Sequence, residues 1–421
     1  MALVVILDGG LTRADLGAER RLLRIARWFG KGRAEPDSAT LPLHDPVVDL
    51  VRAEVAKRPV LIVGSLSQAG MDNVARRIDP RVRALSAPVG GAQLQAVRSA
   101  FVDQPFALCG QVSHSAALRV AAAEVLPEIA LHWTVPFRAF RPHHWVKNLL
   151  VFVPILAAHR WDEPGLWLQA GLAFAAFCLA SSSVYLTNDL FDIEDDRAHP
   201  VKRLRPLASG QMRPRQAAVM ASLMLVAGLM LAATAGAVAI LGAYAIASLA
   251  YSLKLKTLPV VDLVWLVGLY CLRLLAGGMA TGIAVSGWLL AYGACVFASL
   301  ALAKRCAELA GAKAGTLTLP GRRGYRLGDQ RTLTMAGLAA AVGSGGVLGL
   351  YLQEAQAIDL YDQPVWLLLA GAIVVGWLLR VWWLVSRNRL VSDPIVFALR
   401  DPASLAAGAG VIGLLLLAAG P

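Results

Sequence analysis

The chain has 421 residues, of which 57% are hydrophobic and only 16% are charged, and its mean hydropathy is +0.58. Soluble domains are about 25% charged, so this composition excludes a wholly soluble enzyme. The formal net charge of +12 is typical of a membrane protein whose loops are rich in Lys and Arg, so we expect no nucleic-acid partner.

The first 140 residues are typical of a water-soluble region in which strand-like and helix-like segments alternate. Strand-like segments lie at 2–7, 59–65 and 105–110, and helix-like segments lie near 17–29, 45–57 and 67–77. Short apolar strands separated by helices predict a small parallel α/β sheet. The N-terminal apolar run is interrupted by Asp8, so we interpret it as a strand and not as a signal peptide.

From residue 141 onward, apolar stretches recur at close to the ~20 residues that cross a bilayer. They lie at about 145–160, 165–187, 214–236, 238–255, 259–282, 285–303, 332–353, 364–386 and 403–420. The pattern predicts an all-α polytopic membrane bundle of about nine transmembrane helices over 141–421, a linker over 126–140 and a soluble α/β domain over 1–125. The even-numbered loops are basic, which orients them and the N-terminal domain toward the cytoplasm of a multi-pass inner-membrane protein.

An acidic segment follows the second predicted span. Asn188, Asp192 and Asp196 recur at i, i+4 and i+8, so a continuous helix places them on one face. Carboxylates beside a bundle are costly unless a metal or a positive charge neutralises them. Mg²⁺ takes one or two carboxylates plus phosphate oxygens, so this face predicts a Mg²⁺-diphosphate site. The basic residues Lys202, Arg203 and Arg205 follow directly, and we expect them to bind further phosphate oxygens. Solvated charges at a helix end are the alternative, but they do not explain the spacing.

Several sequence motifs resemble those of the UbiA superfamily of intramembrane prenyltransferases, and within it those of the decaprenyl-phosphate phosphoribosyltransferase branch. The motifs are RPHHWVKN (141–148), NDLFDIEDDRAHPVKRLRP (188–206), YSLKLKTLPVVD (251–262), LRLLAGG (272–278), AKRCAEL (303–309), RRGY (322–325) and DPIVFALRD (393–401). The resemblance implies a transferase that joins a polyprenyl phosphate to the ribose of 5-phosphoribosyl diphosphate and releases diphosphate. It implies that Asn188, Asp192 and Asp196 hold Mg²⁺, that Asp262 is catalytic with the two acids, and that Tyr251, Lys256 and Asp262 complete the opposing wall.

The chemistry agrees with what the resemblance implies. Ribose C1 gains oxocarbenium character as the diphosphate leaves, so neutralising the leaving diphosphate supplies most of the catalysis. The attacking lipid phosphate is already anionic and needs no general base, which suits a site with acids and cations alone.

Further candidates for substrate binding are polar residues near or within the spans. Arg273 lies inside an apolar span, where an arginine is costly to bury and therefore indicates function. Lys147 and Asn148 lie in the motif RPHHWVKN. We interpret Lys304, Arg305, Glu308 and Arg322 as part of a basic cytoplasmic rim, although for Lys304 and Arg322 the basic bias of cytoplasmic loops is an equally good explanation.

Two other functions compete with phosphoribosyl transfer. One is transfer of a prenyl group from its diphosphate to a small aromatic acceptor. Typical prenyltransferases carry a second Asp-rich cluster, whereas this chain offers Asp262 beside Lys254 and Lys256, which favours two anionic substrates. The other is a transporter or lipid-binding scaffold, but the acids lie at one membrane face and no inverted pair of interrupted helices is evident.

The N-terminal domain resembles the haloacid dehalogenase-like phosphatases over about residues 1–125. In that alignment the nucleophile position falls on Ile6, the phosphate-binding hydroxyl falls near Gly64, and the metal-binding loop becomes Gly110-Gln111-Val112. Gln95 and Arg98 stand where the family has lysine. An isoleucine cannot attack phosphorus, so we predict an inactive, phosphatase-like scaffold. The alternative is a rebuilt hydrolase centre made of Asp8, Asp15 and Ser65.

Overall fold

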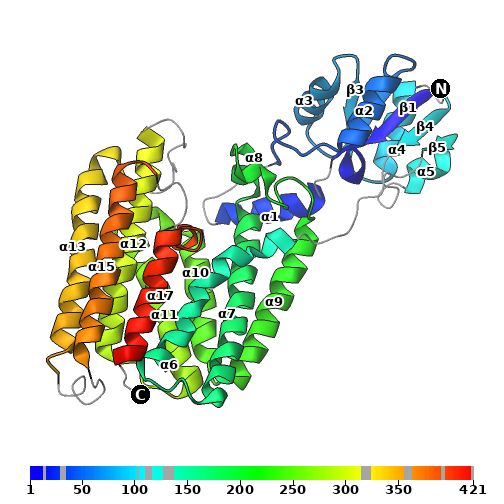
Figure 1. Ribbon diagram of the computed structural model, residues 1–421. Coiled ribbons are helices and arrows are strands. Elements are labelled where there is room, and N and C mark those ends of the chain that lie inside the picture. The colour runs from blue at the N-terminus through cyan, green and yellow to red at the C-terminus, as the bar shows by residue number, and fades with distance from the viewer. Residues whose placement is uncertain are drawn as a thin grey trace. The chain divides into compact units, whose positions relative to one another are not determined.

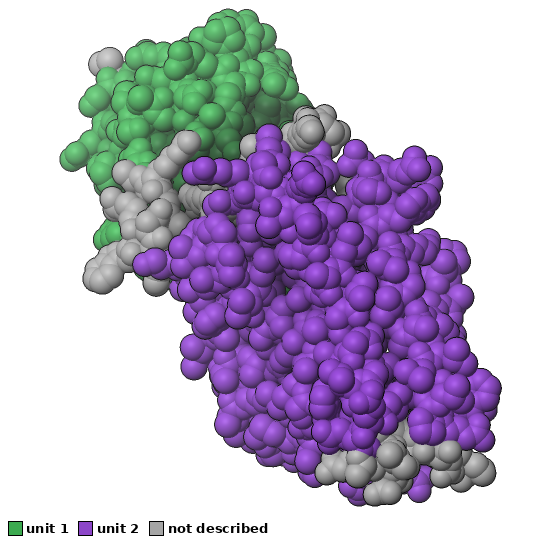
Figure 2. All heavy atoms as spheres, turned by 90° about the vertical axis from the view of Figure 1, so that its left-hand side faces the viewer, with its two compact units in different colours: residues 1–140, 185–223 green, residues 141–184, 224–421 purple. Residues whose placement is uncertain are grey.

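The computed structural model describes residues 1–12, 16–28, 35–101, 104–109, 116–126, 137–313, 324–354, 363–389 and 394–418. These residues form two compact units (Figure 2). Unit 1 contains Met1–Phe140 and Tyr185–Leu223, and unit 2 contains Arg141–Val184 and Met224–Pro421. The acidic segment, which the sequence assigns to the membrane domain, therefore groups with the N-terminal residues.

Unit 1 contains the predicted parallel sheet (Figure 1). Its five strands have the order β3-β2-β1-β4-β5. The strands are β1 (Ala2–Ile6), β2 (Val60–Gly64), β3 (Arg83–Ser86), β4 (Phe106–Cys109) and β5 (Glu124–Val125), and every pairing is parallel. The helices are α1 (Leu16–Trp28), α2 (Asp45–Glu54), α3 (Gln68–Ile78), α4 (Gly91–Phe101), α5 (Ala116–Ala121) and α8 (Ile193–Ala198).

The central strand β1 is apolar throughout because both of its faces are covered. Leu3 and Val5 belong to one hydrophobic core, and Val4 and Ile6 belong to a second core on the opposite face. A strand buried on both faces reads as a continuous apolar run and not as an alternating pattern. This burial explains why β1 could be predicted from the sequence.

Unit 2 is helical, and α7 and α9 continue from it into the residues of unit 1. Its elements are α6 (Val153–Ala157), α7 (Pro164–Phe191), α9 (Pro214–Thr234), α10 (Val238–Leu253), α11 (Val261–Thr281), α12 (Gly287–Lys313), α13 (Gln330–Tyr351), α15 (Pro364–Ser386), α16 (Pro394–Ala398) and α17 (Pro402–Ala418). Within the described ranges, six helices are long and apolar enough to cross a membrane: α7, α9, α11, α12, α13 and α15. The apolar helices α10 and α17 are shorter, so the count of about nine spans is not confirmed.

The first predicted span differs most from expectation. Residues Pro142–Phe152 form a 3₁₀ helix, η4, which is continued by the short α6. Pro154 has no N–H to donate to Leu150, and the N–H of Val153 bonds to the Leu150 carbonyl instead, which is the 3₁₀ pattern. With three residues per turn, every third side chain lies on one line, and Asn148, Val151 and Pro154 are buried.

Glycine allows α11 to approach η4 closely. A Cβ at Gly277 would lie 2.0 Å from the Val151 carbonyl oxygen, so the two backbones pack without a side chain between them. Gly277 is one turn from Arg273, and Val151 is one 3₁₀ turn from Asn148. This contact therefore sets the distance between two of the candidate site residues.

We predict that Gly277→Ala lowers the thermal midpoint of the purified protein in detergent, because the added methyl group must push α11 and η4 apart. Overpacking of this kind costs about 1–3 kcal/mol. The matched control is Gly268→Ala on the same helix, where a Cβ meets nothing within 4 Å. Equal thermal midpoints for the two variants would show that the close approach is not needed.

Candidate active site

The acidic segment, residues 188–206, keeps the predicted spacing although its helix is interrupted. Helix α7 ends at Phe191, and Asp192 lies in a turn before α8. The backbone N–H of Asp192 still bonds to the Asn188 carbonyl at 2.9 Å, and that of Asp196 bonds to the Asp192 carbonyl at 2.8 Å. Asn188, Asp192 and Asp196 are therefore linked in i, i+4 steps as the sequence predicts.

Two buried carboxylates of this segment share one arginine. An Arg205 N–H donates to Asp196 at 2.5 Å and to Asp189 at 3.2 Å. Burial raises the pKa of Asp196 above its ordinary value, while the positive charge of Arg205 opposes the rise. Asp189 was not among the predicted site residues. Its i, i+7 spacing to Asp196, which also places two side chains on one helix face, is the signal that could have found it.

The donor set of the segment fits Mg²⁺ bound together with a phosphate ligand. Within the described part of the chain, no three Asp, Glu, His or Cys side chains gather closely enough to hold a metal ion by themselves. Mg²⁺ is usually bound by one or two carboxylates plus substrate phosphate oxygens, and Asp192, Asp196 and the Asn188 amide supply such oxygens. Lys202 and Arg203 are exposed in the 3₁₀ turn Lys202–Leu204 that follows.

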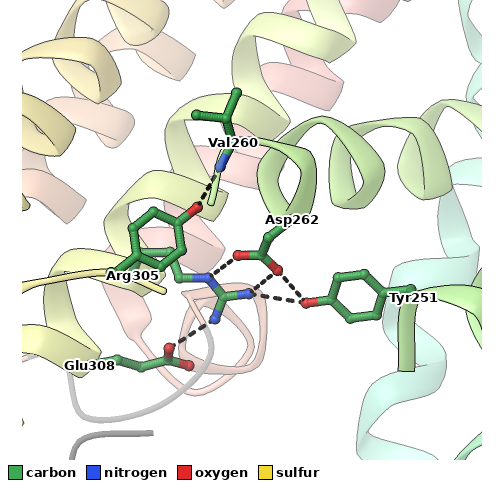
Figure 3. Close-up of polar contacts among 6 residues, drawn as sticks. Tyr251, Val260, Asp262, Arg305 and Glu308 are labelled. Carbon is green, nitrogen blue, oxygen red and sulfur yellow. Dashed lines mark hydrogen bonds and ion pairs between the residues drawn. The ribbon is translucent and has the colours of Figure 1, made fainter. Parts of the chain in front are cut away.

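The second cluster, in unit 2, surrounds Asp262 at the start of α11 (Figure 3). Asp262 is fully buried and accepts Arg305 N–H groups at 2.7 and 2.9 Å and the Tyr251 hydroxyl at 2.7 Å. Arg305 also donates to Glu308 at 2.8 Å. Arg305, which we interpret from the sequence as part of a basic cytoplasmic rim, has a side chain that is 2% exposed and pairs with a buried carboxylate, which requires a charged partner. Lys304, the preceding residue, is half-buried on α12.

The backbone before Asp262 is strained. Val260 has a φ of 68°, in the left-handed region that a β-branched side chain rarely adopts. Its N–H donates to the Tyr325 hydroxyl at 3.3 Å. Lys256 lies just upstream, half-buried in the 3₁₀ turn Leu255–Thr257. Val260 directly precedes α11, in which Asp262 is the second residue.

A third cluster, also in unit 2, surrounds the buried Arg273. Its guanidinium donates to Asn148 at 2.9 Å, to the Leu269 carbonyl at 2.5 Å and to the Tyr244 hydroxyl at 2.9 Å. It also lies over the Tyr244 ring at 4.6 Å from the ring centre. Within the described residues its partners are neutral, so its positive charge is not cancelled by a carboxylate. The Lys147 ammonium lies 6.0 Å from the centre of the Tyr270 ring, which the Arg273 guanidinium also faces at 5.6 Å.

Asp8 and Ser65 lie together at the ends of β1 and β2. The Asp8 carboxylate accepts both the backbone N–H and the hydroxyl of Ser65 at 3.0 Å. Ile6, which the predicted resemblance aligns with the phosphatase nucleophile, is fully buried in β1. Arg322, Asp15, Gln111 and Val112 lie outside the described residues.

We predict that Arg305→Gln destabilises the protein strongly, because it leaves the Asp262 carboxylate buried without a charged partner. Breaking a buried pair in this way costs about 3–5 kcal/mol. The double variant Asp262→Asn with Arg305→Gln removes both charges, and its thermal midpoint in detergent is expected to recover most of the loss. The control is Arg331→Gln, an exposed position on α13. A single variant as stable as the wild type would contradict the pairing.

Residues 149–401 match the UbiA prenyltransferase family. The uncharacterized protein y4nM of Sinorhizobium fredii is 31% identical and covers 99% of this chain, which spans 91% of that protein. The nodulation protein NoeC of Azorhizobium caulinodans is 35% identical over 67% of this chain and 94% of its own length.

Two further comparisons concern the membrane region. A decaprenyl-phosphate phosphoribosyltransferase of Mycolicibacterium smegmatis is 39% identical over 178 residues, and this alignment spans about half of that enzyme, 56% of its length, and 41% of this chain. The structure of a UbiA homolog from Archaeoglobus fulgidus bound to DMAPP and Mg²⁺ has a TM-score of 0.51 at 17% identity and covers 66% of this chain and 98% of that chain. That likeness concerns the fold alone. Together with the membrane-length helices, these matches identify the chain as an integral membrane protein of the UbiA prenyltransferase family.

Proposed function

We propose that the chain is a Mg²⁺-dependent intramembrane transferase that moves 5-phosphoribose from phosphoribosyl diphosphate to a polyprenyl phosphate and releases diphosphate. Its place in the UbiA family supports transfer chemistry within the membrane. The 39% identity to a decaprenyl-phosphate phosphoribosyltransferase supports this donor and this class of lipid acceptor.

The pairing of Asp262 with Arg305 is the observation that carries this choice. A prenyl diphosphate held by metal ions on both sides requires a second set of available carboxylates. Here the acid on α11 is neutralised by Arg305 and hydrogen-bonded by Tyr251, so it contributes little free negative charge. We therefore assign metal binding to the acidic segment. The cationic side chains of Arg205, Arg273 and Lys147 suit two anionic substrates.

The roles of the residues follow from their charges. Asn188, Asp192 and Asp196 would hold Mg²⁺, which when bound neutralises the leaving diphosphate. Arg205 balances Asp189 and Asp196, and its side chain is 30% exposed and therefore accessible to phosphate oxygens. The bond from ribose C1 to diphosphate breaks, and a bond from C1 to an oxygen of the lipid phosphate forms. The attacking oxygen is already anionic, so no side chain has to remove a proton.

The buried Arg273 fits a role in binding phosphate. Its uncancelled charge is costly in an apolar bundle, and an anionic ligand would offset that cost. Lys147 adds a second cation near the same tyrosine ring. We assign the acidic segment and the N-terminal residues to the cytoplasmic side of the inner membrane, in keeping with the basic loops.

Labelled phosphoribosyl diphosphate tests this function directly. The purified full-length chain is incubated with that donor, a polyprenyl phosphate and Mg²⁺, and the lipid fraction is analysed with and without a chelator. We expect a labelled lipid that disappears when the chelator is present. Absence of this product from folded protein would overturn the proposal.

Asp192→Asn is expected to reduce turnover by about two orders of magnitude or more while leaving the thermal midpoint near that of the wild type, since a half-buried ligand is lost without a change in shape. The matched control is Asp162→Asn, an exposed aspartate before α7 that lies outside the acidic segment. Both variants are compared by initial rates of lipid-product formation. Full activity of the Asp192 variant would show that the metal is held elsewhere.

Prenyl transfer is the second candidate, favoured by one observation. The structural neighbour that shares this fold was solved with DMAPP and Mg²⁺, so the fold accommodates a prenyl diphosphate. Incubation with a prenyl diphosphate and a small aromatic acceptor distinguishes the two reactions. A prenylated product, with none from phosphoribosyl diphosphate, would favour this second function.

A further inference from the structure

Helix α1 carries a buried carboxylate that pairs with the acidic segment. Glu19 is 1% exposed and accepts two N–H groups of Arg197, at 2.7 and 2.8 Å. The two residues are 178 positions apart in the chain and both belong to unit 1. A buried bidentate pair with these short distances is a specific contact, since neither charge has water to replace its partner.

Arg197 is placed where it can fix the geometry of the metal-binding residues. It directly follows Asp196, and its Nε donates to the Ala208 carbonyl at 3.2 Å. Arg197 therefore ties α8 to the chain that returns beyond Arg205, the residue that bridges Asp189 and Asp196. Arg197 is thus adjacent in sequence to one of these carboxylates and hydrogen-bonded to the chain three residues after their arginine.

The next residue of α1 contacts the chain at the end of a strand of the sheet. Arg20 donates to the Ser65 carbonyl at the end of β2, and the Ser65 N–H and hydroxyl are held by Asp8 at the end of β1. Leu16, at the start of α1, is buried in the hydrophobic core that includes Leu3 and Ile62 of the sheet. Consecutive residues of one helix thus connect the sheet ends to the acidic segment.

We propose that α1 is a positioning element through which the N-terminal domain holds the acidic segment in its metal-binding geometry, with Glu19 and Arg197 as the positioning residues. This inference rests on the proposed function in so far as the acidic segment binds the metal. It gives the N-terminal domain a role that requires no chemistry of its own. Neither Glu19 nor Arg197 contacts substrate in this role, because both are buried against each other.

Metal affinity measured apart from turnover tests the proposal. Binding of Mn²⁺ to the purified full-length protein is followed by electron paramagnetic resonance in the presence of inorganic diphosphate. Glu19→Gln is expected to weaken Mn²⁺ binding by about tenfold or more, the usual effect of losing a residue that orients a metal ligand. The matched control is Arg21→Gln, an exposed position on the same helix, which is expected to bind Mn²⁺ as the wild type does.

Two more variants distinguish a loss of the positioning role from a folding defect. Glu19→Asp keeps the charge but shortens the side chain, so it is expected to fold and to bind Mn²⁺ with intermediate affinity. The charge exchange of Glu19→Arg with Arg197→Glu is expected to restore part of the affinity lost in Glu19→Gln. Wild-type Mn²⁺ affinity in folded Glu19→Gln or Glu19→Asp, with or without a lower thermal midpoint, would overturn the positioning role.

The outcome for the proposed function is separate. If the wild type binds Mn²⁺ and Glu19→Gln binds it weakly, but no phosphoribosyl lipid forms, the positioning role stands and phosphoribosyl transfer fails. If the lipid forms and Mn²⁺ affinity does not depend on Glu19, the reverse holds. A wild type that makes the lipid without binding Mn²⁺ at the acidic segment would overturn the positioning role.

Discussion

A charge removed from water must be neutralised, and the packing of α11 against α12 depends on how this chain meets that requirement at Asp262. The carboxylate is fully buried, and the bidentate contact with Arg305, supported by Tyr251, compensates for the lost hydration. The strained backbone at Val260 lies two residues before Asp262, so the strain and this pair occur together at the start of α11. Because Asp262 is paired with Arg305, its carboxylate is not readily available to bind a metal ion.

The same requirement is met differently in the acidic segment. The Arg305 side chain is 2% exposed, whereas that of Arg205 is 30% exposed. An arginine in a buried ion pair keeps its carboxylate partner. A partly exposed arginine can exchange a carboxylate for a phosphate at a small cost in free energy. The buried Arg273 is a third case, because its described partners are neutral and its charge remains available to an anion. These three arginines thus differ in the partner that each can accept.

The sheet of unit 1 could largely be predicted from the sequence. The strands β1, β2 and β4 are continuous apolar runs, and the predicted parallel sheet is confirmed. The edge strand β3, Arg83–Ser86, was not predicted because it lacks such a run and has exposed ends. The continuous helix that would place Asn188, Asp192 and Asp196 on one face is interrupted at Asp192, although the i, i+4 backbone bonds remain. The partners of the acids are not local in sequence. No periodicity could show that Glu19 meets Arg197, or that Arg305 and not Lys304 faces Asp262.

The 3₁₀ helix η4 changes the reach of the segment that begins unit 2. Its 11 residues and the five of α6 would measure about 24 Å as an α-helix, at 1.5 Å per residue. With the 11 residues of η4 at the 3₁₀ rise of about 2.0 Å and the five of α6 at about 1.5 Å, the lengths of the two helices add up to about 30 Å. This length equals the thickness of a typical hydrocarbon core, ~30 Å. A segment that is too short by residue count is therefore long enough to match the thickness of the bilayer.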